Sequence, residues 1–297
     1  MKNIKKRWSL MLALSLVLSL TACSGASTNT DGVEPRQEVT ANETVDSDGS
    51  ETGENSDTAA DVGSDLQYVQ EKGSLVIGIT EFEPMDYQDS SGNWIGFDAD
   101  LAVAFAESLG VTPTFQLIDW DNKVFELNGK TIDVVWNGMT LTDEVRSAME
   151  CSVPYFNNAQ VVVVSADNAD GLDNLEAVSG LQYAVENGSA GMAQAQANDF
   201  SYTEVIDQAT ALLEVSSGTT DAAVIDFLMA KAMTGPGTSY ENLAITVSLN
   251  SEEYGVGFRK GSDLAEKLND FFKESYESGV MIEIAQRYNI EEALVAQ

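Results

Sequence analysis

From about Leu66 onward, short apolar runs alternate with amphipathic stretches all the way to the C-terminal end. Runs of four to eight apolar residues between turn residues are typical of buried strands, and apolar residues spaced three or four positions apart are typical of helices. Their alternation predicts an α/β protein with mostly parallel sheets.

The first half of this pattern predicts one helix among several strands. In the helix, over residues 97–110, Leu101, Phe105 and Leu109 share one face, Asp98 is expected as the N-cap and Gly110 as the stop. The strands are expected over 74–80, 112–118, 131–137 and 160–166.

A second series of strands and helices follows, and it predicts a second lobe. Two strand-like connections, over 159–165 and 243–249, suggest that the chain crosses twice between the lobes. We expect lobe 1 to comprise residues 66–161 and 250–297, lobe 2 to comprise 162–249, and a ligand to bind in the cleft between them. The strands of this series are expected over 181–186, 203–206, 221–226, 243–249 and 254–258, and its helices over 172–178, after Gly188–Ser189, over 209–216, after Asp226, and twice between 262 and 288.

The N-terminal end carries the pattern of a signal peptide over residues 1–22. Four basic residues precede an apolar run over 8–20 that is too short to span a membrane comfortably. The run ends in "LTAC", which resembles the lipobox of bacterial lipoproteins, so Cys23 is expected to carry a lipid such as palmitate on the extracytoplasmic face of the cell membrane. An ordinary secretory signal or a membrane anchor is the alternative.

Residues 23–65 predict a disordered acidic tether. The part from Ser24 to Asp65 has 11 acidic residues, one basic residue and no aromatic residue. Such a composition buries too little apolar surface to offset the entropy cost of ordering, and its like charges keep the chain extended.

Charge and residue usage exclude several classes of function. From Cys23 onward the chain has 48 acidic and 11 basic residues, a formal charge of −37, which repels nucleic acid and anionic lipid headgroups. The chain has no histidine, which excludes a Ser-His-Asp triad, a Cys-His pair and a His-ligated zinc site. Cys151 is the only other cysteine and is expected to be a small buried apolar residue.

Three stretches together resemble a known family. They are "GITEFEPMDY" with "GNWIGFDADL", then "DWDNKVFELNGKTIDVVWNGMTLT", and later "DAAVID". They are similar to the family 3 solute-binding proteins, which serve ABC importers of polar amino acids, and the resemblance covers residues 67–297. It implies a type II periplasmic-binding-protein fold whose two lobes close on a polar or basic amino acid, an ABC permease as partner, a monomer, and no metal or organic cofactor.

The resemblance also assigns roles to residues of the first lobe. Phe82 corresponds to the aromatic residue that stacks on the ligand, and Trp120 to the opposite wall. Asn137, Gly138 and Thr140 occupy the turn that holds the α-amino and α-carboxylate groups. Phe82 and Trp120 could instead be plain core residues.

In the second lobe the resemblance points to a turn and a carboxylate. Gly188 and Ser189 lie at a turn that opens a helix, and Asp226 matches the carboxylate that pairs with the ligand's ammonium group. The alternative for Asp226 is a helix N-cap. A zwitterion loses hydration in a closed cleft, so each of its charges needs an opposite charge or several hydrogen bonds there.

One family feature is displaced. In the family the turn runs "GMT-x-T-x-x-R", and its arginine binds the ligand carboxylate, but Val145 occupies that position and Arg146 follows it. A step of one helical residue is a rotation of about 100°, so Arg146 is expected to point elsewhere. Ala190 also replaces a hydroxyl residue that the family often places there. Either Arg146 or backbone groups near Gly188 satisfy a carboxylate, or the ligand is a cationic amine without one.

Acidic and aromatic residues predicted near the cleft favour the amine, because both bind cations. The alternative for these acids is the acidity of the whole chain. Two other classes of function stay open: an enzyme, since dehydratases share this fold, and a surface sensor. The residues are Glu81, Glu83, Asp86, Glu186 and Asp226, with Phe82, Trp120, Trp136 and Tyr155.

Overall fold

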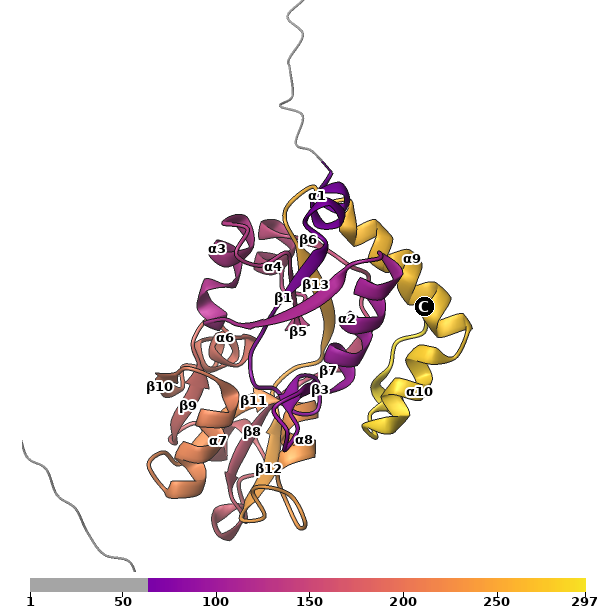
Figure 1. The fold of residues 1–297 in the computed structure, drawn as a ribbon. Coiled ribbons are helices and arrows are strands. Elements are labelled where there is room, and N and C mark those ends of the chain that lie inside the picture. Colours follow the sequence, from indigo (N-terminus) through magenta and orange to yellow (C-terminus); the bar gives the residue numbers. More distant parts are fainter. Residues whose placement is uncertain (1–63) are drawn as a thin grey trace, which may run out of the picture. The chain divides into compact units, whose positions relative to one another are not determined.

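The computed structural model describes residues 64–297, which form two lobes, each built on its own central β-sheet (Figure 1). The predicted signal peptide, the lipidated Cys23 and the tether up to residue 63 lie outside the described residues. None of the helices within 64–297 is long and apolar enough to cross a membrane.

The first lobe contains a six-stranded sheet with the order β4-β1-β5-β13-β6, and β7 also pairs with β13. Its strands are β1 (Ser74–Ile79), β4 (Thr112–Leu117), β5 (Val134–Thr140), β6 (Glu150–Cys151), β7 (Phe156–Asn158) and β13 (Glu252–Phe258). A two-stranded hairpin, β2 (Tyr87–Gln88) with β3 (Trp94–Ile95), adjoins it in sequence. The helices of this lobe are α1 (Asp65–Lys72), α2 (Phe97–Ser108), η1 (Trp120–Asn122), α3 (Lys123–Asn128), α4 (Asp143–Ala148), α9 (Leu264–Glu277), α10 (Val280–Arg287) and η3 (Glu291–Ala293).

The second lobe contains a five-stranded sheet with the order β10-β9-β11-β8-β12. Its strands are β8 (Gln160–Ser165), β9 (Gln182–Glu186), β10 (Ser201–Val205), β11 (Ala222–Asp226) and β12 (Leu243–Ser248). Its helices are η2 (Ala166–Asn168), α5 (Leu175–Val178), α6 (Ala190–Ala197), α7 (Gln208–Ser217) and α8 (Phe227–Met233).

Both sheets are mixed, which corrects the expectation of mostly parallel sheets. In the first, β1 pairs parallel with β4 and β5, while β13 is antiparallel to its three partners. In the second, β9 pairs parallel with β10 and β11, while β8 is antiparallel to β11 and β12. The antiparallel pairings of the two sheets all involve β8 or β13, the strands that directly follow the two crossings between the sheets.

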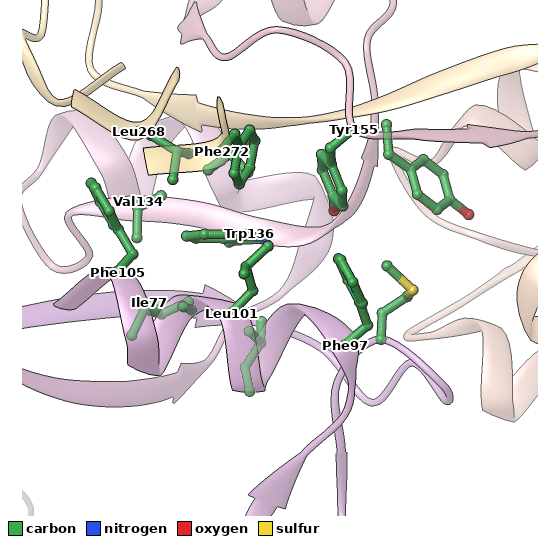
Figure 2. Close-up of a cluster of buried hydrophobic side chains, with 14 of the residues drawn as sticks. Ile77, Phe97, Leu101, Phe105, Val134, Trp136, Tyr155, Leu268 and Phe272 are labelled. Carbon is green, nitrogen blue, oxygen red and sulfur yellow. The ribbon is translucent and has the colours of Figure 1, made fainter. Parts of the chain in front are cut away.

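Alternate residues of β5 serve two apolar cores in the first lobe, because successive side chains of a strand point to opposite faces. Val134 and Trp136 belong to a core shared with α2 and α9, and Val135 and Met139 to a smaller one shared with α3 and α4. Figure 2 shows Trp136 between side chains of α2 and α9, and Tyr155 near Phe97. Trp136 and Tyr155 are fully buried, so the expectation that they offer faces to the cleft was wrong.

Helix α2 begins at Phe97, the first residue of the predicted range, but it is not capped by Asp98, which corrects that prediction. Gly96 holds the N-cap position with φ of +127°, and a Cβ there would lie 2.1 Å from the Met85 carbonyl oxygen. This close approach places Asp98 inside the first turn, where it is buried. Its Oδ2 accepts hydrogen bonds from the Gly138 N–H at 2.6 Å and the Tyr155 hydroxyl at 2.7 Å.

The folded part starts slightly before the predicted end of the tether at residue 65. Ser64 Oγ accepts a hydrogen bond from the Gln67 N–H at 3.1 Å and so caps α1. Asp65 is buried and pairs with Arg259, whose Nε lies 3.0 Å from Asp65 Oδ2. The last two residues of the predicted tether therefore belong to the first lobe.

The chain passes between the two sheets twice, from β7 to β8 and from β12 to β13. Glu252 links the crossings, because its Oε1 accepts hydrogen bonds from Asn158 Nδ2 at 2.7 Å and Gln160 Nε2 at 2.8 Å. The second sheet begins with Gln160, close to the predicted lobe boundary after residue 161, and the exact lobe limits stay a prediction.

Candidate functional site

A cavity of about 430 Å³ is lined by residues of both lobes. Of the nine residues predicted to contact a ligand, all except Arg146 line it. The lining residues are Phe82, Trp120, Asp121, Lys123, Val124, Asn137, Gly138, Met139, Thr140, Thr142, Asp143, Glu144, Val145 and Ala148 from the first lobe, and Glu186, Gly188, Ser189, Ala190, Met192, Ala193, Gln196, Gln208 and Asp226 from the second.

Asp226 is a buried carboxylate at the end of β11, held by neutral donors. Its Oδ1 accepts from Asn158 Nδ2 and the Tyr254 hydroxyl, both at 2.6 Å, and its Oδ2 accepts from Gln208 Nε2 at 2.6 Å. Burial, and then repulsion from Glu252, raise its pKa to about 7. Within residues 64–297 no basic side chain lies within 4.0 Å of it.

The alternative role of Asp226 as a helix cap is not realised. Asp226 does occupy the N-cap position of α8, but its side chain makes no capping hydrogen bond. Its own backbone N–H donates to Gln208 Oε1 at 2.9 Å, so Gln208 holds both the backbone and the carboxylate of this residue. The carboxylate is therefore fixed at the cavity wall.

Glu186 is a second buried carboxylate in the wall, at the end of β9. Its Oε1 has no hydrogen-bond partner among the described residues, and Gln208 Nε2 is 3.5 Å from its Oε2. Burial, followed by repulsion from Asp226, raises its pKa to about 8. Among residues 64–297 neither carboxylate has a basic side chain within 4.0 Å, so this part of the cavity favours a cation.

The second half of β5, from Asn137 to Thr140, forms part of the first-lobe side of the cavity and is strand, where the resemblance implied a turn. Asn137 is tied to β1, since its Oδ1 accepts from the Thr80 N–H at 3.0 Å and its Nδ2 donates to Thr80 Oγ1 at 2.7 Å. Gly138 has φ of +56°, and a Cβ there would lie 2.4 Å from Phe82 Cε1. Only glycine allows the Phe82 ring this close to the strand.

Three further predicted residues, Thr140, Ser189 and Trp120, line the cavity. Thr140 Oγ1 donates to Glu252 Oε1 at 2.8 Å, and Ser189 Oγ caps α6 by accepting from the Met192 N–H at 3.0 Å. Trp120 is 7% exposed and is covered on one face by Lys123, whose Nζ lies 4.7 Å from the ring centroid.

The two lobes approach each other closely at Gly188. This residue has φ of +70°, and a Cβ on it would lie 2.7 Å from Asp121 Oδ1 and 2.8 Å from Asp121 Cα. Lys123 Nζ also donates to the Gly188 carbonyl oxygen at 3.0 Å. The absence of a side chain at Gly188 therefore lets the lobes meet at the cavity.

Arg146 lies outside the cavity, which corrects its inclusion among the ligand contacts. It is exposed on α4, whereas Val145, one residue earlier, is buried and lines the cavity. The rotation of about 100° per helical residue accounts for the difference.

Three acidic residues expected at the cleft do not line the cavity either. Glu81 and Glu83 are partly buried beside Phe82, whose ring alone reaches the cavity. Asp86 is fully buried within the first lobe, where burial and then repulsion from Asp98 raise its pKa well above the ordinary value. Phe82 is thus the one residue of the segment 81–86 that lines the cavity.

Sequence analysis missed several polar residues of the site. Lys123 lines the cavity from the start of α3, while Gln208, Asn158 and Tyr254 hold Asp226 in place. The sequence did contain one indication of Lys123. It follows Trp120 by three positions, and residues at this spacing share a face in a helix. Asn158 and Tyr254 are far from Asp226 in sequence, and no sequence pattern links them to it.

Within 64–297 no cluster of three or more His, Cys, Asp or Glu residues is placed to hold a metal ion.

Residues 75–291 match the family described as bacterial extracellular solute-binding proteins, family 3. The L-cystine-binding protein TcyJ of Escherichia coli is 27% identical over 228 residues, covering 75% of this chain and 85% of the relative. The arginine-binding extracellular protein ArtP of Bacillus subtilis is 27% identical over 224 residues, covering 73% and 86%.

A solved structure agrees with these relatives. The substrate-binding protein of an ABC uptake transporter from Streptococcus pneumoniae, with bound histidine, superimposes with a TM-score of 0.71 at 30% identity, covering 78% of this chain and 99% of that one. An enzyme is also similar: the cyclohexadienyl dehydratase of Pseudomonas aeruginosa is 24% identical over 173 residues, covering 57% of this chain and 65% of the enzyme. The predicted two-lobed type II fold is confirmed.

Proposed function

Since the chain belongs to the bacterial extracellular solute-binding proteins, family 3, we propose that it captures a polar or basic amino acid in the cavity between its lobes and presents it to an ABC permease. The observation that carries this proposal is Asp226, a buried carboxylate that lines the cavity and has only neutral hydrogen-bond donors. A ligand ammonium or guanidinium group supplies the positive charge that this carboxylate needs.

Charge in the cavity wall supports a ligand with a net positive end. The lining includes five acidic residues and one basic residue, Lys123. Relatives named for arginine and histidine binding support a basic amino acid, while the relative named for cystine supports a polar one. In this proposal Phe82 and Trp120 are the apolar walls. Polar contacts come from the end of β5, from Asn137 to Thr140, and from the Gly188–Ser189 turn.

Binding proceeds in two stages in this account. The ligand first contacts the first lobe, at Phe82, Trp120 and Thr140. Approach of the second lobe then adds Asp226 and the Gly188 turn, which completes the pairing of the ligand's charges. The crossing segments joined by Glu252 are the hinge about which the lobes move.

A cationic amine without a carboxylate is the second candidate ligand. The position of Arg146 outside the cavity favours it, because the family's usual carboxylate partner is then missing from the wall.

A binding role is proposed over catalysis, since the excess of acidic residues in the wall repels anionic substrates. We further propose that the protein acts as a monomer, held at the outer face of the membrane by a lipid on Cys23.

The test is a thermal-shift screen of the purified protein against amino acids, their methyl esters and simple amines. A ligand at about 100 times its Kd stabilises a folded protein by about 2.7 kcal/mol, which raises Tm by about 5–10 °C for a domain of this size. A response to an amino acid or amine supports the proposal. No response to any of them, with turnover of an anionic substrate instead, would overturn it.

A further inference from the structure

Lys123 is a buried basic residue of the cavity wall that the proposed contacts do not use. It begins α3 directly after η1, three positions after Trp120, and is 8% exposed. Among the described residues that line the cavity it is the one basic side chain, facing five acidic ones. Arg146, the other basic residue of this region, lies outside the cavity.

The ammonium group of Lys123 has no anionic partner in the described part of the chain. Its Nζ donates to the carbonyl oxygens of Trp120 at 3.1 Å and Gly188 at 3.0 Å. No carboxylate of residues 64–297 lies within 4.0 Å of it. An ammonium has three N–H groups, so one remains for a further acceptor.

Burying an ammonium without an ion pair is costly, and a similar apolar side chain would cover Trp120 without that cost. Burial lowers the pKa of Lys123, and the acidic groups that oppose this shift are, in order, Glu186, Asp121 and Glu144. The remaining N–H of this buried ammonium group is open to an anion that enters the cavity. Helix α6 begins at Ala190, two residues after the carbonyl that accepts from Lys123, and its N-terminal dipole favours negative charge at the same place.

We propose that Lys123 is the basic group that binds the ligand's carboxylate. It would replace the arginine that the family carries at the position of Val145. This inference rests on the proposed function and selects an amino acid over an amine without a carboxylate. The ligand then lies with its carboxylate between Lys123 and the start of α6 and its positive group at Asp226 and Glu186. Lys123 both discriminates among ligands and contacts the second lobe through Gly188.

The experiment measures the affinity of the purified full chain for L-arginine, L-histidine and L-cystine and for their methyl esters by calorimetry. Three proteins are compared: the unchanged chain, Lys123→Met, and Lys123→Gln, which keeps a donor but removes the charge. Lys273→Met, an exposed change on α9, is the matched control for the loss of one positive charge. Melting temperatures and circular dichroism establish that each variant is folded.

We expect both Lys123 variants to weaken binding of the free amino acid by about 10- to 100-fold and to change ester binding by less than about 3-fold. Lys273→Met is expected to leave both ligands unaffected. Equal losses for acid and ester, or no loss in either variant, would overturn the inference and leave Lys123 as a tie between the lobes. If none of the six compounds binds the unchanged chain, the comparison uses the amino acid found by the thermal-shift screen and its methyl ester. If no amino acid or amine binds at all, the proposed function fails, and this inference falls with it.

Discussion

Asp98 Oδ2 accepts a hydrogen bond from the backbone N–H of Gly138 at 2.6 Å, which fixes the cavity-lining part of β5 to helix α2. The same oxygen accepts from the Tyr155 hydroxyl at 2.7 Å, and Asp98 is fully buried. The carboxylate thus lies behind the cavity-lining part of β5 and contacts it through the backbone N–H of Gly138. It is a positioning residue, since it does not line the cavity.

Replacing Asp98 by alanine is expected to destabilise the fold and weaken ligand binding together. The change leaves the Gly138 N–H and the Tyr155 hydroxyl without their acceptor, at a cost of about 1–3 kcal/mol for each buried group. Urea unfolding gives the loss of stability, and calorimetry gives the loss of affinity. Glu274→Ala, an exposed change on α9, should alter neither. Full stability in Asp98→Ala would refute the role of this carboxylate.

Gly188→Ala is expected to impair closure of the lobes. The added Cβ would lie 2.7 Å from Asp121 Oδ1 and 2.8 Å from Asp121 Cα, so the second lobe cannot approach as closely. We expect a loss of affinity of about 10-fold or more, since misplacement of about 1 Å at a closing site has effects of that size. Small-angle scattering with ligand should report a less compact bound state.

Gly218→Ala is the matched control for this change. Gly218 has φ of +76°, close to the +70° of Gly188, but an added Cβ would meet nothing within 4 Å. Both substitutions therefore carry a similar backbone cost of about 1–2 kcal/mol. Only Gly188→Ala should lose affinity, and equal losses in the two variants would show that backbone strain, not closure, is responsible.

Ligand binding is expected to depend on pH, because two carboxyl groups of the cavity wall, Asp226 and Glu186, have pKa values near neutrality. Burial raises the pKa of Asp226 to about 7 and that of Glu186 to about 8, so the free protein holds protons on them near neutrality. A cationic ligand favours their charged forms. We therefore expect proton release on binding at pH 7, and an affinity that rises from pH 6 to pH 8.5. Calorimetry in phosphate and Tris buffers should give different apparent enthalpies, and identical enthalpies would contradict this expectation.

The same carboxylates set the pH dependence of stability without ligand. Their folded-state pKa values lie above the unfolded ones, so the stabilisation they provide is complete below about pH 4 and is lost as pH rises through 7 and 8. Glu186→Gln removes one of the two groups. In urea titrations at pH 5 and pH 9, this variant should lose less stability between the two pH values than the unchanged chain does. An equal loss would mean that Glu186 is not protonated in the folded protein.

Local sequence patterns were sufficient for most elements of the fold. The strand over 74–80 and the helix over 209–216 appear within one residue of their predicted ends, because runs of valine and isoleucine and a 3.6-residue period report burial directly. The direction of the strands was not predictable in this way. Strand pairing depends on how distant segments return to the sheet, as β13 does beside β5.

Residues that line the cavity were predictable where a motif marks them, as with Gly188 and Asp226. Which of their neighbours face the cavity and which face the core was not predictable. Trp136 resembles a cleft residue in sequence, yet the alternation of β5 points it into the core with Phe272. Tertiary packing likewise decides that Val145, and not Arg146, faces the cavity.

The central claim is that Asp226 binds the positive group of an amino-acid ligand, and calorimetry of Asp226→Asn tests it most directly. The asparagine keeps the shape and can still accept from Asn158 and Tyr254, but it removes the charge. With the ligand found by the thermal-shift screen, we expect an affinity loss of about 30-fold or more, as for removal of one partner of a buried charged pair. Asp167→Asn, an exposed change in the second lobe, should bind as the unchanged chain does. Equal affinity of Asp226→Asn and the unchanged chain would contradict the account.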